Sequence, residues 1–317
     1  MTNAEWTDLL LAAHPASPAV TWHGVVQALA QLALGASSPE ELHRMTVLPD
    51  RILAESAFDL WKTFPTAAPR TSARLAQWCT GSKAVLIMDA LSLREMKVIV
   101  EEAKRRELAV SAEVTFSEAP SDTTVFAKAL GTPTRASLAN NGKSGSFKLF
   151  GGRCSTDSTS VPFEDVSVPP VPSVVIWHSF VDDLIHLGNK TAAEVFKLTR
   201  QQLQDDGFWE LIDALRTGRQ LVITSDHGYA DAAKFSTEIK EPSDAVDFLK
   251  ANFHGKRFAD NANPQARFLP PLFLVSNGTC MVTGQRKWSV QGGFPKICHG
   301  GLSLLEVSSP WIELPAK

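Results

Sequence analysis

Aspartate and histidine residues occur in this sequence at spacings that suit a metal site. Asp226 and His227 are adjacent in VITSDHGY, and Asp182 lies four residues before His186. Residues four apart on a helix project from one face, so Asp182 and His186 can meet the same ion. Aspartate oxygens and histidine nitrogens, without cysteine, suit zinc or a similar divalent ion.

Most of these side chains follow apolar segments that are typical of buried strands. Asp89 directly follows AVLIM, Asp226 follows LVITS, and Asp182 comes shortly after VVIWH. Thr123 lies in a turn between a strand and a helix, and His299 lies in the turn KICHGG. Ligands of open α/β sheets bind beyond the carboxyl ends of the strands, so we expect these residues to gather there.

Strand and helix patterns alternate from residue 84 onward. Residues 84–88 are apolar throughout, as in a strand buried on both faces, and residues 108–116 alternate. Helical patterns follow at about 93–107, after Pro120, and near 191–217. This order predicts an α/β fold with a mostly parallel sheet flanked by helices.

Other segments depart from that alternation. Residues 1–83 have apolar residues at helical spacing and predict a helical N-terminal region. Residues 131–172 are rich in Gly, Ser, Thr, Asn and Pro and predict an irregular loop or insertion. The segment CMVTGQRKWSV predicts a β-hairpin around TGQR, and LSLLEV a short helix.

Composition indicates an ordinary globular protein. The chain has 317 residues, 44% of them hydrophobic, and a net charge of −3, which excludes a surface that is basic overall. Four widely spaced cysteines form no CxxC pair. The N-terminus has no signal-peptide pattern, and no apolar run reaches the roughly 18–20 residues that span a bilayer. We therefore expect a cytoplasmic protein that does not engage membranes.

Five segments together resemble the PglZ family of the alkaline-phosphatase superfamily, which is associated with bacterial anti-phage systems and some signalling proteins. They are, in order, VLIMDALS, PSDTTVFAKAL, WHSFVDDLIH, VITSDHGY and HGGLSLLEV. The resemblance covers about residues 84–310 and leaves residues 1–83 outside it. It implies an alkaline-phosphatase-like PglZ catalytic domain over 84–317.

The resemblance also implies two divalent metal ions, zinc or manganese, and a threonine nucleophile, Thr123. One ion would be held by Asp89, Thr123, Asp226 and His227, and the other by Asp182, His186 and His299.

Several residues have competing interpretations. Thr124 and Ser121 are close to Thr123, and Asp183 shares a helical face with His186 at a spacing of three. Asp89 could instead cap the helix that begins near Ser92. The spacing of the family favours Thr123 and Asp182. We interpret His178 as structural.

The resemblance favours a phosphodiesterase that acts on nucleotides or oligonucleotides. It also implies that protein partners, where present, would belong to a defence complex. Loop 131–172 would shape substrate preference, and Phe147 and Phe150 could stack on bases. Two alternatives stay open: a phosphomonoesterase, and an interaction module with a structural metal. Candidate phosphate-binding cations are Arg94, Lys128, Lys143, Lys148 and Arg153.

Overall fold

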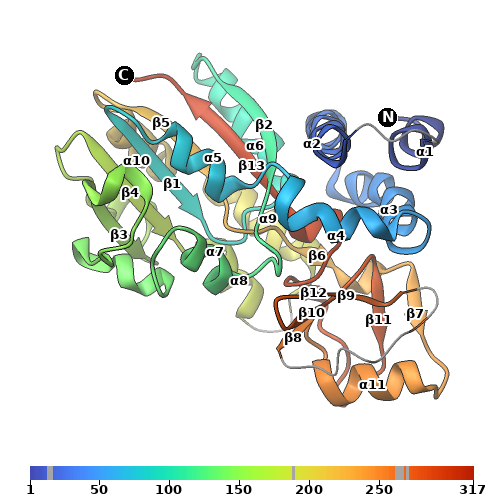
Figure 1. Cartoon of the computed structure of the whole chain (residues 1–317). Helices are drawn as coiled ribbons and strands as arrows, with labels where there is room; N and C mark the ends of the chain where they lie inside the picture. Colours follow the sequence, from blue (N-terminus) through green and yellow to red (C-terminus); the bar gives the residue numbers. More distant parts are fainter. Residues whose placement is uncertain (13–16, 188–189, 261–267, 269–270) are drawn as a thin grey trace.

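A six-stranded sheet forms the centre of the protein (Figure 1). The structure is a computed structural model and describes residues 1–12, 17–187, 190–260, 268 and 271–317. The strand order is β2-β13-β5-β1-β4-β3; β13 runs antiparallel to both neighbours and the other pairs are parallel. The predicted mostly parallel sheet is confirmed. Its strands are β1 (Lys83–Met88), β2 (Ser111–Phe116), β3 (Ser155–Thr159), β4 (Ser173–His178), β5 (Gln220–Thr224) and β13 (Ser308–Leu314).

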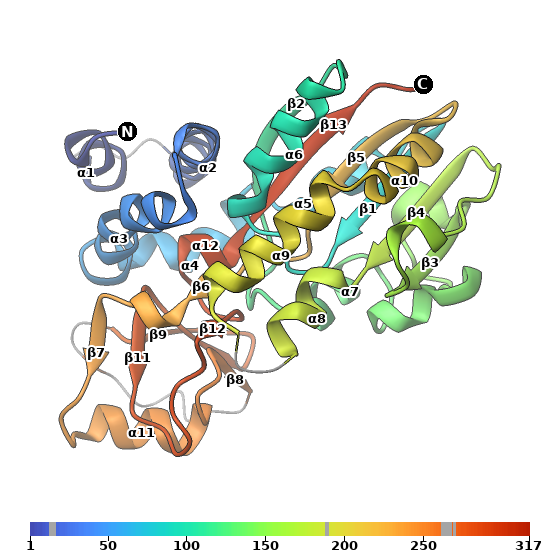
Figure 2. The same ribbon diagram turned by 180° about the vertical axis from the view of Figure 1, so that it is seen from behind.

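Helices cover both faces of this sheet (Figures 1 and 2). In β1, Val85 and Ile87 belong to one core cluster, which includes Phe126 of α7, whereas Leu86 and Met88 belong to the cluster on the other face. Successive side chains of a strand point to opposite faces, so a strand buried on both has to be apolar throughout. The covering helices are α5 (Thr71–Trp78) and α7 (Thr123–Ala129) on one face, and α6 (Leu93–Arg105), α9 (Ala192–Gln204) and α10 (Asp206–Arg216) on the other.

The N-terminal residues are helical, as their periodicity predicts. Trp22 of α2 is fully buried, and its ring centroid lies 5.2 Å from that of Trp61, 5.1 Å from Phe64 and 5.5 Å from Phe116 of β2. The helices therefore share a core with the sheet, and the division of the chain at residue 83 stays a prediction. They are α1 (Asn3–Leu11), α2 (Pro18–Gly35), α3 (Pro39–Glu55) and α4 (Phe58–Ala67).

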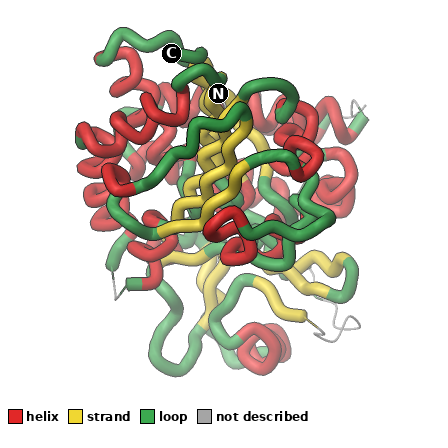
Figure 3. The backbone as a smooth tube through the Cα atoms, turned by 90° about the vertical axis from the view of Figure 1, so that its left-hand side faces the viewer, coloured by secondary structure: helices red, strands yellow, loops and turns green. Residues whose placement is uncertain are grey.

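A smaller part with short strands lies beyond the ends of the strands of the main sheet, on the side where β13 begins (Figures 1 and 3). It ends at α12 (Leu304–Val307), which leads into β13 and confirms the short helix expected in LSLLEV. Its elements are β6 (Ala230–Asp231), β7 (Thr237–Ile239), α11 (Asp244–Phe253), β8 (Phe258–Asp260), β9 (Phe273–Ser276), β10 (Thr279–Val282), β11 (Arg286–Trp288) and β12 (Ile297–Cys298).

The predicted hairpin around TGQR is wrong. β10 pairs with β9 and β8, and β11 pairs with β7 in parallel. The actual hairpin turns at Asn277 and Gly278, whose φ angles are 49° and 81°. Asn-Gly is a strong signal for a two-residue hairpin turn, because both central residues adopt positive φ.

The predicted long helix at 191–217 is also wrong, because Asp205 divides it into α9 and α10. Asp205 has an extended backbone, and its side chain accepts a hydrogen bond from the Gly207 N–H, which starts the second helix. Loop 131–172 contains short 3₁₀ turns and the edge strand β3, so part of it belongs to the sheet. Within the described residues, no helix is long and apolar enough to cross a membrane.

We predict that Trp22→Ala lowers the free energy of unfolding by about 3–5 kcal/mol, because it empties the aromatic cluster that joins α2 to the sheet. Chemical denaturation would measure the change. Val20→Ala, at a position 58% exposed on the same helix, is the control and should change stability by less than about 0.5 kcal/mol. Equal effects of the two substitutions would show that the N-terminal helices contribute little to the common core.

Candidate metal centre

The residues that the sequence analysis singled out meet at one edge of the sheet. Asp89 follows β1, Asp226 and His227 follow β5, and α8 (Phe180–His186), after β4, carries Asp182 and His186. Six of the residues form two groups, in each of which one potential ligand atom per residue lies within 4.8 Å of the others. The first group is Asp89, Asp226 and His227, and the second is Asp182, His186 and His299.

Thr123 lies beside the first group. Its Oγ1 is 3.2 Å from Asp89 Oδ1 and 3.2 Å from His227 Nε2. His227 Nε2 is in turn 3.5 Å from Asp226 Oδ2 and 3.8 Å from Asp89 Oδ1. The hydroxyl is thus within hydrogen-bond reach of groups that can take its proton.

The two buried carboxylates of the first group have only part of the compensation that buried charges require. Asp226 Oδ1 accepts hydrogen bonds from the Ala90 N–H and the Ser225 hydroxyl, but Oδ2 has no hydrogen-bond partner although it is buried. Burial raises the pKa of Asp226 to about 6; burial, with the Asp226 charge, raises the pKa of Asp89 well above its usual value. A divalent cation between them would satisfy both, so the donor set fits a metal ion.

Backbone carbonyls orient two of the histidines. His227 Nδ1 lies 3.0 Å from the Gly228 carbonyl oxygen, and His299 Nδ1 lies 3.4 Å from that of Ser121. A carbonyl only accepts, so each Nδ1 donates, which leaves Nε2 as the ring atom that can bind a metal. This arrangement is typical of metal-binding histidines.

The second group adjoins the first through stacked imidazoles. The rings of His227 and His299 lie 4.4 Å apart at 9°, and His186 lies 5.8 Å from His299. The hydrogen bond with Asp182, 3.2 Å from His186 Nε2, raises the pKa of His186. Burial lowers the pKa of His299 to about 4 and keeps its ring neutral, as a ligand requires.

Other candidates are engaged elsewhere. Asp183 accepts a hydrogen bond from the Ser179 hydroxyl, and Ser121 bonds the backbone of Gly300 and Gly301. Both ring nitrogens of His178 have hydrogen-bond partners, consistent with a structural histidine.

The structure also bears on two competing interpretations, Asp89 as a helix cap and Thr124 in place of Thr123. Ser92 caps α6 in a capping box with Glu95, so Asp89 is not the N-cap. Thr124 is exposed, and its N–H is capped by Asp122.

Glycines let backbone segments approach closely at this edge. A Cβ on Gly228 would lie 2.3 Å from the carbonyl oxygen of Leu305 and 2.8 Å from that of Ser308. The loop that carries Asp226 and His227 therefore packs directly on α12 and β13. We expect every larger residue at 228 to displace that loop.

Arg135 is the functional candidate that sequence analysis missed. It lies in the 3₁₀ segment Arg135–Asn141, and its Nη1 donates to Asp89 Oδ2. The charge of Asp89 and, to a smaller extent, those of Asp182 and Asp226 raise the pKa of Arg135, so a permanent cation is in contact with the first group. No periodicity marks this residue in the sequence.

Other predicted contacts near the site are not observed. Arg94 is buried and donates to the Tyr229 carbonyl, and Lys143 donates to that of Cys154. Phe147 is 3% exposed and packs in the core, so it cannot stack on a base without leaving it. The structure assigns no site contact to Lys128, Lys148 or Arg153.

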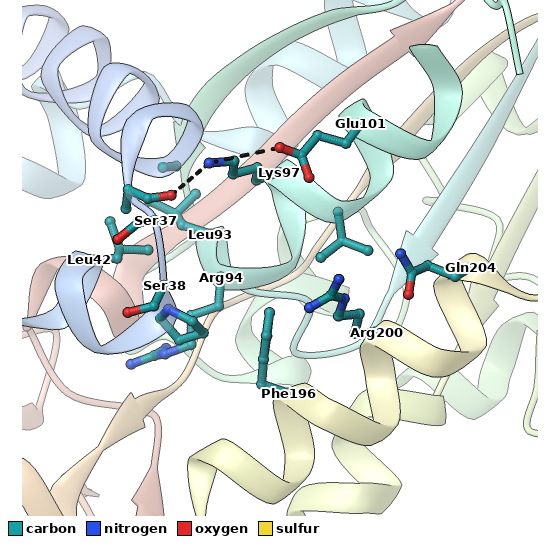
Figure 4. Close-up of a pocket in the computed structure, with 14 residues that line it drawn as sticks. Ser37, Ser38, Leu42, Leu93, Arg94, Lys97, Glu101, Phe196, Arg200 and Gln204 are labelled. Carbon is teal, nitrogen blue, oxygen red and sulfur yellow. Dashed lines mark hydrogen bonds and ion pairs between the residues drawn. The ribbon is translucent and has the colours of Figure 1, made fainter. Parts of the chain in front are cut away.

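A separate hollow of about 320 Å³ lies between the α2–α3 junction, α6 and α9 (Figure 4). None of the seven predicted residues lines it. Its Lys97 donates to the Ala36 carbonyl and lies 3.8 Å from Glu101, so this cation is already paired. We therefore place the chemistry at the strand ends and not in this hollow.

We predict that Asp226→Asn stabilises the metal-free protein above pH 6. In the folded protein the pKa of Asp226 is raised from 3.8 to about 6. The neutral carboxyl group therefore contributes to folding stability at low pH, and this contribution is lost as the pH rises through about 6. The variant should gain on the order of 3 kcal/mol over wild type at pH 8, and nothing near pH 4. Denaturation in chelator across that range measures the difference. A gap independent of pH would contradict the assignment.

Comparison with known proteins identifies no family for this chain. No protein-family model and no curated protein matches it. Among solved structures it is similar to phosphonoacetate hydrolase from Sinorhizobium meliloti 1021, with a TM-score of 0.39 and 11% identity, over 74% of this chain and 90% of that one. It is also similar to murine ectonucleotide pyrophosphatase/phosphodiesterase 5, with a TM-score of 0.39 and 13% identity, over 73% and 87%. Similarity at this level carries no argument about the site.

Proposed function

We propose that the chain is a metal-dependent phosphoester hydrolase with Thr123 as its nucleophile. One observation carries the proposal: two aspartate–histidine groups adjoin through the stacked rings of His227 and His299, with the Thr123 hydroxyl beside them. A purely structural metal site has no need of a second group or of a hydroxyl at hydrogen-bond distance from two potential bases.

The residues present fit two divalent ions. Asp89, Thr123, Asp226 and His227 would hold one, and Asp182, His186 and His299 the other. When bound, zinc or manganese ions would supply Lewis-acid chemistry, which lowers the pKa of the attacking hydroxyl and stabilises the charge on the leaving oxygen.

The chain's own residues would then carry out two displacements. Thr123 Oγ1 gives its proton to solvent, attacks phosphorus and forms a phosphothreonine as the bond from phosphorus to the leaving oxygen breaks, and the leaving oxygen takes up a proton from solvent. Water next attacks the same phosphorus as the bond from phosphorus to Thr123 Oγ1 breaks, and the proton that water loses restores the threonine hydroxyl. Two in-line steps give net retention at phosphorus. The Arg135 guanidinium would bind a non-bridging oxygen, where charge is concentrated in the transition state.

The substrate class rests on the resemblance to the PglZ family, which favours a nucleotide or oligonucleotide diester and a role in phage defence. Arg135 supports a second candidate, a phosphomonoesterase, because a further cation suits the dianion of a monoester. An interaction module with structural metal would leave the position of Thr123 unexplained.

We predict that metal-stripped protein regains hydrolysis of bis(4-nitrophenyl) phosphate on addition of zinc or manganese. Thr123→Ala should lower kcat by at least about 10³-fold, because the covalent path is lost. Thr124→Ala, at the exposed neighbouring hydroxyl, is the control and should stay within a few-fold of wild type. Tight binding of two metals without any hydrolysis would instead support the interaction module.

A second prediction separates diester from monoester hydrolysis. Arg135→Gln should lower kcat/KM for 4-nitrophenyl phosphate by about 10²-fold, and that for the diester by less, since removal of one transition-state donor costs about this much. It should also tighten metal binding in calorimetry, because Arg135 no longer competes for Asp89. Arg153→Gln, an exposed arginine of the same loop, is the control. Equal losses on both substrates would remove the argument for a monoesterase.

A further inference from the structure

We infer that a cavity beside His186 and His299 binds the leaving group of the substrate and selects leaving groups that carry a second negative charge. The inference rests on the proposed function and deepens it. The cavity has a volume of about 460 Å³, enough for one ring with a charged substituent. Residues of α8, of the 255–258 turn and of the 295–299 segment line it.

The position of the cavity relative to Thr123 suits a leaving group. In an in-line displacement the leaving oxygen departs on the side of phosphorus opposite the attacking oxygen. Thr123 Oγ1 lies beside the first group, whereas the cavity is bounded by His186 and His299 of the second. A substrate with its phosphoryl group between the two groups would extend its leaving group into the cavity.

The charge of the cavity is positive. Lys190, Lys256 and Lys296 line it, and within the described part of the chain Lys256 has no ion-pair partner. Lys190 donates to the Leu187 carbonyl and interacts electrostatically with Glu194. Arg257 also reaches the wall but is buried and paired with Glu306 at 3.0 Å. The acidic side chain in the lining, Asp122, already accepts hydrogen bonds from two N–H groups at the start of α7. Lys190 and Lys256 are therefore available to an anionic ligand.

The remaining wall is apolar and closely fitted. Ile185, Pro295 and Ile297 contribute aliphatic surface, and Phe258 lies against Gly300. A Cβ on Gly300 would lie 2.5 Å from Phe258 Cδ1, and its φ of 92° also favours glycine. Gly300 thus allows the Phe258 ring to lie next to the His299 loop. An occupant with an apolar or planar part and an anionic group matches this combination of surfaces.

A matched pair of substrates tests the inference. Methyl 3-carboxy-4-nitrophenyl phosphate and its 3-carboxamide differ in the charge of the leaving group and little else. We expect metal-loaded protein to prefer the carboxylate about tenfold in kcat/KM, as one charge-assisted hydrogen bond would give. Lys256→Gln combined with Lys190→Gln should reduce the preference to about twofold. Lys250→Gln, an exposed lysine of α11 outside the cavity, should retain it.

Binding of the released phenols needs no turnover and separates this inference from the proposed function. Calorimetry on the metal-loaded Thr123→Ala variant should show 5-hydroxy-2-nitrobenzoic acid binding about tenfold more tightly than 5-hydroxy-2-nitrobenzamide, with the difference lost in the double lysine background. Equal binding of acid and amide, or equal loss in Lys250→Gln, would overturn the inference. Charge-selective binding without any hydrolysis would support the cavity and count against the proposed function alone.

Discussion

The repulsion between carboxylates buried at one sheet edge governs this part of the structure. Asp89 and Asp226 are fully buried, and Asp182 lies close enough to raise the pKa of both. Uncompensated buried charges cost several kcal/mol each, so the folded chain has to supply cations or accept them. Arg135 supplies one by its contact with Asp89, yet Asp226 Oδ2 still has no hydrogen-bond partner. Further positive charge would therefore stabilise this edge, which supports the metal site that we propose there.

A surrounding polar network joins the strand-end loops to each other and to the N-terminal helices. Glu306 of α12 is fully buried: its carboxylate pairs with Arg257 and accepts from the Gly301 N–H, and its carbonyl accepts from the Gly228 N–H. One residue thus connects the loop of His299 with the loop of His227. Asp50 of α3 accepts from the Leu304 N–H at the start of α12. The N-terminal helices consequently support the site, although they contribute none of its candidate ligands.

The sequence predicted those features that follow from local regularity. Apolar segments such as AVLIM identify buried strands, and the residues directly after parallel strands must lie at one edge of the sheet, so Asp89 and Asp226 could be located without coordinates. β13 was not predicted, because Pro310 argues against a central strand. In the structure Pro310 pairs with Val114, and the Pro310 carbonyl accepts a hydrogen bond from the Thr224 hydroxyl. Arg135 could not be predicted, since its role depends on where an aperiodic loop folds back over β1.

Cations lie beside the carboxylates of the site, and their positions bear on how a substrate would lie. Arg135 provides a cation beside Asp89 of the first group, and Lys190 and Lys256 line the cavity that His186 and His299 of the second group also line. With metal bound, the region of the carboxylates becomes positive as well, and an ester with charge at both ends would meet a complementary group at each position. A chain whose net charge is −3 can in this way present a local field that favours polyanionic esters, because short-range charges outweigh the distant net charge at physiological ionic strength.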